Sequence, residues 1–283
     1  MTGSRILRRK AATLISAIAL VVVTALGAAP GAGACGRDTD CVIGERSYRI
    51  ALPEGRDGTT PIGAIVFVHG YRGTANGVMR NKALTALAAE LGVAFIAAQA
   101  GGPDWNIPGA PSHHALEGID ELAYFDALIE DVTARFAIDR TRLVASGFSA
   151  GAMMVWHLAC YRGASFAGFV PMSGTFWAPV PETCPSGPVN LIHYHGDADP
   201  MVPLTGRPIE NARQGNVFEA IELIARSGSY RPAETGDIPE LQCARQVADD
   251  GKLLELCLFP GKHQLKTRHL ARAWRNFEAS KGG

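Results

Sequence analysis

Apolar and polar positions follow two different periods along the chain after about residue 40. Short runs rich in β-branched residues indicate strands, and longer segments with apolar residues three and four apart indicate amphipathic helices. The expected strands are 47–52, 64–68, 93–97, 143–146, 169–172, 189–195 and two hairpin arms between 243 and 259; the expected helices are 75–91, 120–136, 151–161 and 267–279. This alternation predicts an α/β fold, with a mostly parallel central sheet and helices on both faces.

The first 34 residues have a pattern of their own. Four basic residues between positions 5 and 10 precede an uncharged apolar run over 11–29, and small residues follow at 32–34. This order predicts a signal peptide, residues 1–34, with cleavage near Ala34 and a secreted or periplasmic product without stable membrane association. A retained membrane helix is one alternative. Lipid attachment at Cys35 is another, although Ala32 stands where a lipobox has a large aliphatic residue.

Cleavage at this point changes the charge balance of the chain. The full sequence has 27 basic and 27 acidic residues, and the 249 residues after position 34 retain 23 basic and 27 acidic ones. A mildly negative protein is not expected to bind nucleic acid. The remaining sequence has one composition throughout and no internal repeat, so we expect a single catalytic domain over residues 35–283.

Six cysteines in an exported chain predict disulfides, because export leads to an oxidising compartment and the sequence has no Cys-x-x-Cys pair. The segment between Cys243 and Cys257 predicts a hairpin that turns at 249–251. In that register the two cysteines face each other on a non-hydrogen-bonded rung, close enough to bridge. Elimination then pairs Cys160 with Cys184 and Cys35 with Cys41, although sequence alone does not determine these two connections.

The strand expected at 143–146 runs directly into Gly147, Phe148, Ser149, Ala150 and Gly151, and an apolar helix follows. A Gly-x-Ser-x-Gly turn between a strand and a helix is the nucleophile elbow of the α/β-hydrolase fold. The glycines are needed because side chains there would collide with the neighbouring strand and helix. We therefore expect Ser149 to be a catalytic nucleophile; the alternative is a chance glycine-serine turn.

A serine hydroxyl needs a base to take its proton and an acid to orient that base, and in this fold the acid and then the histidine follow the serine. The stretch HGDADPMVP offers Asp197 and Asp199 after a buried strand; we favour Asp199 and expect Asp197 to be a turn residue. His263 follows the last expected strand and is the expected base. Its rival His269 falls within the terminal helical pattern, where packing is its ordinary role.

Two backbone N–H groups should stabilise the oxyanion that forms when a serine attacks a carbonyl. The fold supplies one from the residue after the nucleophile, here Ala150, and one from the loop after an early strand. That loop is HGYRG at 69–73, and we expect the Tyr71 amide to be the second donor. A simple turn at His69 and Gly70 is a compatible reading.

The segments HGYRGTA, DELAYFDALIEDVTARFAIDRTRLVASGFSAGAMM, HLAC, HGDADPMVP and FPGKH together resemble the polyhydroxybutyrate depolymerase and feruloyl esterase family of secreted α/β-hydrolase esterases. The resemblance spans nearly all of residues 35–283. It implies an exported carboxylesterase with the triad Ser149, Asp199 and His263 and with no metal or other cofactor. The implied substrates are polyhydroxyalkanoate-type esters or feruloyl and acetyl esters of plant polysaccharides.

Two segments depart from the pattern of that family. Pro260, Gly261 and Lys262 precede His263, where many members have a glycine-rich stretch, and Tyr71 replaces a cysteine often found after His-Gly. The first departure bears on the choice of base, and the second changes the wall of the expected pocket. We expect soluble or oligomeric esters as substrates.

Trp105 lies in a long loop rich in glycine and proline, where it either lines the substrate site or anchors the loop by packing. His113 and His114 are adjacent in the same loop, and without further ligands nearby we expect no metal site. His157 follows the elbow on a helix and is expected to be structural.

The leading hypothesis is therefore a serine ester hydrolase that acts through an acyl-enzyme. An exported serine peptidase with the same triad is an alternative, because the triad by itself does not determine which bond is cleaved. A non-catalytic binding protein on a hydrolase scaffold is a second alternative.

Overall fold

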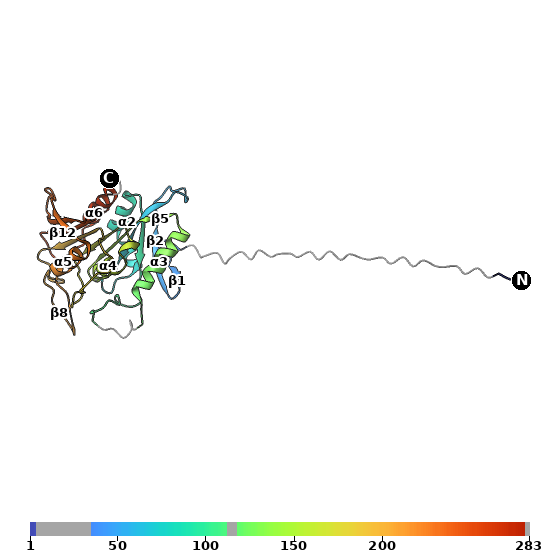
Figure 1. Cartoon of the computed structure of the whole chain (residues 1–283), viewed down its shortest axis with the longest axis horizontal. Helices are drawn as coiled ribbons and strands as arrows, with labels where there is room; N and C mark the ends of the chain where they lie inside the picture. Colours follow the sequence, from blue (N-terminus) through green and yellow to red (C-terminus); the bar gives the residue numbers. More distant parts are fainter. Residues whose placement is uncertain (4–34, 112–117, 281–283) are drawn as a thin grey trace. The chain divides into compact units, whose positions relative to one another are not determined.

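Ten strands form one sheet, in the spatial order β1-β2-β4-β3-β5-β6-β7-β12-β11-β10 (Figure 1). The computed structural model describes residues 1–3, 35–111 and 118–280. The sheet strands are β1 (Cys41–Ile43), β2 (Arg46–Ala51), β3 (Ile62–Val68), β4 (Ala94–Ala98), β5 (Ile138–Phe148), β6 (Gly168–Met172), β7 (Leu191–Gly196), β10 (Arg231–Ala233), β11 (Gln242–Val247) and β12 (Leu253–Phe259). A separate small hairpin pairs β8 (Pro208–Ile209) with β9 (Ala212–Arg213).

The middle of the sheet is parallel. The pairs from β4 through β3, β5, β6 and β7 to β12 all run in the same direction, while β1, β2, β11 and β10 add antiparallel pairs at the two ends. The prediction of a mostly parallel sheet is confirmed. Because the central strands are parallel, the loops that follow them leave from one edge of the sheet.

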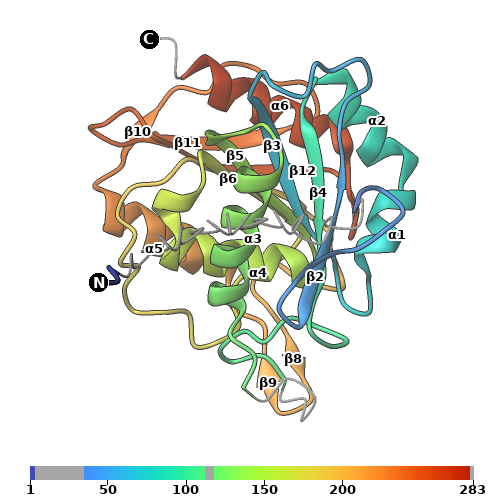
Figure 2. The ribbon, with the colours of Figure 1, turned by 90° about the vertical axis from the view of Figure 1, so that its right-hand side faces the viewer.

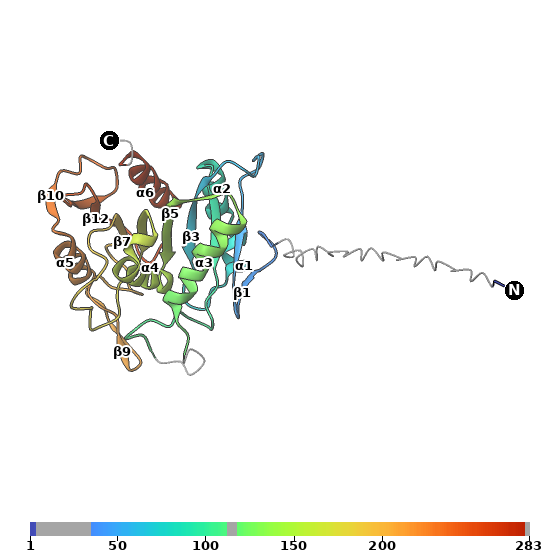
Figure 3. The same cartoon turned by 45° about the vertical axis from the view of Figure 1, so that its right-hand side comes forward.

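Helices cover both faces of the sheet (Figures 2 and 3). They are α1 (Ala75–Arg80), α2 (Lys82–Glu90), α3 (Glu121–Arg135), α4 (Ala150–Tyr161), α5 (Val217–Gly228) and α6 (Thr267–Ala279), with a short 3-10 helix at Gly163–Ser165. Alternate residues of β3 join different cores: Val66 packs with apolar residues of α3, α4 and α5, and Phe67 with those of α1, α2 and α6. Each strand residue therefore selects a face by the two-residue period of the strand.

Two helical expectations differ from the structure. The single helix expected over 75–91 is wrong: the chain breaks at Asn81, whose side chain accepts hydrogen bonds from the Ala83 and Leu84 N–H groups and so begins a new helix. A second helix is not expected from the sequence pattern: α5 at 217–228 begins after Asn216, whose side chain caps the first turn. In both places a local side-chain cap sets the helix start.

The six cysteines form three disulfides, Cys35–Cys41, Cys160–Cys184 and Cys243–Cys257, in the expected pairing. Cys243 lies directly opposite Cys257 in the β11–β12 ladder, and their Cα atoms are 4.1 Å apart. Gly251 adopts the positive φ of 82° that the hairpin turn requires. The sulfur of Cys35 is bonded to Cys41, whereas lipid attachment requires a free thiol at that residue.

Several sequence expectations fall outside the described residues. The expected signal peptide lies almost wholly in the undescribed stretch 4–34, and His113 and His114 lie in the undescribed stretch 112–117. Among the helices that the structure describes, none is both long and apolar enough to span a bilayer.

Candidate active site

Ser149 lies in the turn between the end of β5 and the start of α4. Its backbone has a φ of 59° and a ψ of −125°, a conformation that a residue other than glycine adopts only when its surroundings impose it. One constraint is the hydrogen bond of 3.0 Å that the Ser149 N–H donates to the Met172 carbonyl of β6. The strained turn presents the hydroxyl at the edge of the sheet.

The two glycines of the turn are required by close backbone contacts. A Cβ atom at Gly147 would collide with the carbonyl of Gly151, and one at Gly151 would collide with the carbonyl of Val68. The turn packs against the end of β3 because Gly151 has no side chain, and against the first turn of α4 because Gly147 has none. This is the role that the sequence analysis assigns to these glycines.

Asp199 and His263 come from the loops that follow two neighbouring parallel strands, β7 and β12. The His263 Nδ1–H donates to Asp199 Oδ2 at 2.7 Å. The other carboxylate oxygen, Oδ1, accepts hydrogen bonds from the backbone N–H groups of Met201 at 2.8 Å and Val202 at 3.0 Å. The side chain of Asp199 is fully buried, so these donors replace the water that the carboxylate would otherwise bind.

Asp197 has a different function in the same loop. Its side chain is exposed and accepts a hydrogen bond from the Gly261 N–H at 3.1 Å, and its own N–H donates to the Phe259 carbonyl at 3.0 Å. The Ala198 N–H donates to the Gly261 carbonyl at 3.0 Å. These contacts tie the aspartate loop to the histidine loop, and Asp199 is the carboxylate that reaches the imidazole.

The electrostatics of Asp199 favour its ionised form. Burial by itself raises the pKa of the carboxyl group, but hydrogen bonds from His195, the Val202 backbone and His263 outweigh burial and hold the pKa below its ordinary range. The carboxylate is therefore charged at neutral pH. A charged carboxylate on Nδ1 leaves Nε2 of His263 as the ring nitrogen that can accept a proton.

The imidazole of His263 lies close to the elbow. Its ring centroid is 4.6 Å from that of Phe148, the residue immediately before Ser149, and its side chain is 17% exposed. The rival His269 is buried on α6, where its ring stacks on Tyr194 at 4.6 Å, and burial lowers its pKa to about 4. This environment is that of a packing residue.

A cavity of about 200 Å³ opens beside Ser149. Its lining combines the expected oxyanion residues Tyr71 and Ala150 with the apolar side chains of Met153, Trp177 and Ile209 and with the polar side chains of Arg207 and Gln214. Half of the Tyr71 side chain is exposed at this cavity. The cavity can hold an apolar acyl or aromatic group against the serine.

The loop that carries Tyr71 is held from below by His69. His69 Nδ1–H donates to the Gly70 carbonyl at 2.9 Å, and Nε2 accepts from the Ala100 N–H at 3.2 Å. Burial lowers the pKa of His69, which agrees with this neutral tautomer. Trp105 is 1% exposed, and its indole N–H donates to the His69 carbonyl at 2.8 Å. These contacts favour the packing role for Trp105 over a place in the cavity wall.

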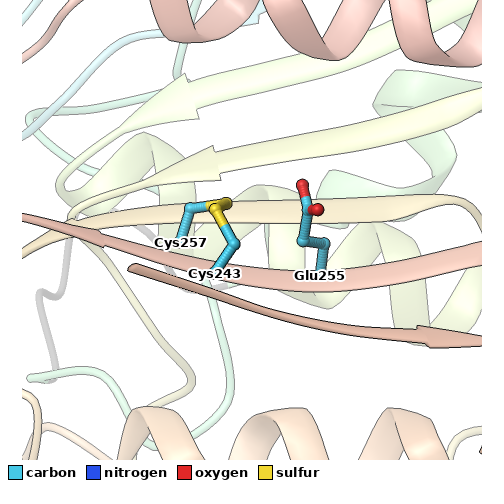
Figure 4. A group of neighbouring side chains, drawn as sticks. All are labelled: Cys243, Glu255 and Cys257. Carbon is cyan, nitrogen blue, oxygen red and sulfur yellow. A yellow bond between two sulfur atoms is a disulfide. The ribbon is translucent and has the colours of Figure 1, made fainter. Parts of the chain in front are cut away.

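One group of potential metal ligands occurs among the described residues: Cys243, Glu255 and Cys257 on β11 and β12 (Figure 4). The two sulfurs are joined to each other, so neither is a thiolate that could bind a metal. Glu255 is fully buried and bound by two arginines, Arg245 at 2.9 Å and Arg272 at 2.6 Å. The group is a structural cluster.

The sequence profile of the phospholipase/carboxylesterase family matches residues 57–214. This chain belongs to that family. A putative esterase, NocK, from Nocardia uniformis subsp. tsuyamanensis is 30% identical over 205 residues, which cover 69% of this chain and 58% of that protein. A probable feruloyl esterase C from Aspergillus terreus is 30% identical over 171 residues, 58% of each chain. The chain thus spans less than two thirds of the length of these two relatives.

Solved structures with lower sequence identity share the fold of this chain. The acetyl xylan esterase from Aspergillus awamori is 15% identical, with a TM-score of 0.60 over 82% of this chain and 94% of that one. A phospholipase/carboxylesterase from Dyadobacter fermentans has a TM-score of 0.54 over 82% of this chain and 96% of the other. These likenesses show the α/β-hydrolase fold.

Sequence reasoning missed several residues near the site. Trp177, Arg207 and Gln214 line the cavity but come from irregular segments whose pattern does not point to it. His193 and His195 were also missed, although they alternate on one strand and therefore share a face. That spacing is a signal from which a buried histidine pair could have been inferred.

Proposed function

We propose that this protein is an exported serine carboxylesterase with Ser149 as nucleophile, His263 as general base and Asp199 as the orienting acid. The observation that carries the proposal is the 2.7 Å hydrogen bond from His263 to a buried, ionised Asp199, with the same imidazole against the residue that precedes the strained Ser149. The carboxylesterase family of the chain supports the ester bond as the target.

In the proposed reaction Ser149 Oγ attacks the ester carbonyl while His263 Nε2 takes its proton. The backbone N–H groups of Ala150 and Tyr71 stabilise the oxyanion; Ala150 is the first residue of α4, where a helical N–H has no partner within the helix. His263 then gives the proton to the departing alcohol. Water, activated by the same imidazole, releases the acid from the acyl-enzyme.

The proposed substrates are feruloyl or acetyl esters linked to polysaccharides, with polyhydroxyalkanoate-type oligomers as the other ester class. The apolar side chains of Met153, Trp177 and Ile209 beside Ser149 suit an aromatic acyl group. Curated relatives named feruloyl esterase C support the first class. Three disulfides agree with an oxidising compartment and hence with export.

The nucleophile is tested with a fluorophosphonate probe and an ester assay. The wild-type protein should be labelled and should hydrolyse short p-nitrophenyl esters, and Ser149→Ala should lose both properties. His269→Gln is the matched control for His263→Gln: the first should keep ester turnover and the second should lose it. Peptide cleavage without ester turnover would favour a peptidase, and a folded wild type that takes no label would favour a binding protein.

The substrate class is tested by initial rates at equal enzyme concentration. Methyl ferulate, an acetylated xylan, a p-nitrophenyl ester and a hydroxybutyrate oligomer form the panel. The proposal expects methyl ferulate or acetylated xylan to exceed the oligomer in kcat/KM. The opposite order would assign the protein to the polyester class.

A further inference from the structure

A second imidazole lies at the carboxylate of Asp199. His195, on β7, is fully buried, and its Nε2 atom lies 2.8 Å from the Val202 carbonyl and 3.4 Å from Asp199 Oδ2. Both neighbours are hydrogen-bond acceptors. The Nε2 atom of His195 must therefore carry a proton, which it donates to the Val202 carbonyl while it faces the carboxylate at the longer distance.

The other nitrogen of His195 is held by a third histidine. His193 Nε2 lies 2.8 Å from His195 Nδ1, and Trp156 of α4 covers the His193 ring at a centroid distance of 5.4 Å. Burial and then the neighbouring His195 lower the pKa of His193 well below its ordinary value, and a backbone contact with Pro171 opposes them only in part. A neutral His193 that donates from Nε2 leaves His195 Nδ1 as an acceptor, which agrees with the proton on His195 Nε2.

The titratable groups that face His195 are few. His193 precedes it on the same strand, and Asp199 follows it in the loop, with His263 on the far side of that carboxylate bond. The residues of β12 in register with His193 and His195 are Leu256 and Leu258. On the side of β12, His193 and His195 therefore face apolar residues.

We propose that His195 is a positioning residue that holds Asp199 Oδ2 from within the core, with His193 setting its tautomer. The inference rests on the proposed triad. Oδ1 accepts from two backbone N–H groups and Oδ2 from His263, and the His195 Nε2 atom lies 3.4 Å from the same Oδ2, so both oxygens are held in the orientation that faces His263. The second imidazole also withdraws negative charge from the oxygen that faces His263.

Removal of the His195 donor should have two consequences. The carboxylate is held by one side-chain donor fewer, so the base is less well oriented and kcat falls while substrate binding is spared. The remaining negative charge also concentrates on the oxygen that faces His263, which stabilises the protonated imidazole. The acidic limb of the pH–rate profile should therefore move to higher pH.

The test compares three variants. His195→Leu removes the donor, His195→Gln retains an amide N–H at a similar place, and His157→Leu replaces another buried histidine that lies on α4. We expect His195→Leu to lower kcat by roughly 10- to 100-fold with little change in KM and to shift the acidic limb upward. His195→Gln should recover part of both effects. His157→Leu should change neither kcat nor the acidic limb.

A folded His195→Leu variant with wild-type kcat and pH profile would overturn the proposal. If that variant fails to fold, nitrogen NMR of the wild type tests the proposal by identifying the tautomer of His195. The Nε2–H tautomer is the expected result, and the Nδ1–H tautomer would contradict the proposal. The effect of His195→Leu on the titration of His263 can be measured by NMR without any substrate. If the wild type hydrolysed none of the esters, the proposed function would be refuted, and the effect of His195 on His263 could still be measured.

Discussion

The turn around Ser149 is made by five consecutive residues, whereas the Asp199–His263 pair joins two loops 64 residues apart. The turn is shaped by the strained backbone of the serine and by two glycines, of which Gly147 packs against the first turn of α4 and Gly151 against the end of β3. The Asp199–His263 pair instead depends on β7 and β12 being neighbours and on backbone hydrogen bonds between their loops. The proposed nucleophile is thus presented by a turn of consecutive residues, while its proposed partners are brought together only by the tertiary structure.

The two regions also differ in what stabilises them. The elbow lies in the middle of the sheet, where β5 has a parallel neighbour on each side. β12 borders the antiparallel end of the sheet, where the Cys243–Cys257 disulfide and the buried Glu255 with Arg245 and Arg272 fasten it. A substitution that destabilises this end of the sheet should therefore disturb the position of His263 more than that of Ser149.

Asp199→Asn should have the largest effect on activity. An amide in place of the carboxylate favours the wrong tautomer of His263, and by analogy with the serine protease triad kcat should fall by roughly 10⁴-fold. Asp197→Asn is the control, because that side chain only tethers the Gly261 backbone. Ester kinetics measure both, and equal losses in the two variants would contradict the assignment of Asp199.

Glu255→Gln should have the largest effect on stability. The change leaves two arginines without their buried counter-charge, which costs about 3 to 5 kcal/mol of unfolding free energy. Glu240→Gln is the surface control: its ion pair with Arg268 is more than half exposed and should cost about 0.5 kcal/mol. Urea denaturation measures both. A stability for Glu255→Gln within error of the control would show that the cluster does not fasten β12.

Gly151→Ala should destabilise the elbow. The new Cβ atom collides with the Val68 carbonyl, and we expect a loss of about 3 kcal/mol in unfolding free energy together with loss of fluorophosphonate labelling. At Gly36 the same added atom meets only the Ile50 carbonyl at 3.9 Å, so Gly36→Ala is the matched control. Thermal unfolding and labelling are measured on both. If Gly151→Ala were labelled normally, the position of Ser149 would not depend on this packing.

The smallest expected effect concerns pH. The pKa of Asp199 is lower in the folded than in the unfolded state, so its ionisation stabilises the protein above the unfolded pKa of about 4, and this contribution is lost as the pH falls below that value. The difference in unfolding free energy between the wild type and Asp199→Asn should shrink by about 2 kcal/mol from pH 7 to pH 2. A difference independent of pH would contradict the electrostatic account.

Much of the fold follows from short-range patterns. The six strands expected from alternation and apolar runs are all present, and the two hairpin arms pair in the register that places Cys243 opposite Cys257. The helix expected over 75–91 is interrupted because the Asn81 side chain accepts hydrogen bonds from the Ala83 and Leu84 N–H groups, and a second helix begins there. Periodicity reports which face of an element is buried and does not detect such a cap.

The sequence by itself determined the strand–turn–helix context of Ser149, the need for glycine at 147 and 151, and the hairpin that joins Cys243 to Cys257. Each of these follows from a strand–turn–helix or hairpin pattern that a short stretch of sequence displays, although the carbonyl that excludes a side chain at 151 belongs to Val68 of β3. Only the tertiary structure decided that Asp199, and not Asp197, meets His263, that Trp105 packs against the loop at 69–73, and that His195 lies beside the same carboxylate. Those contacts depend on strand order and loop packing, to which residues far apart in the chain contribute together.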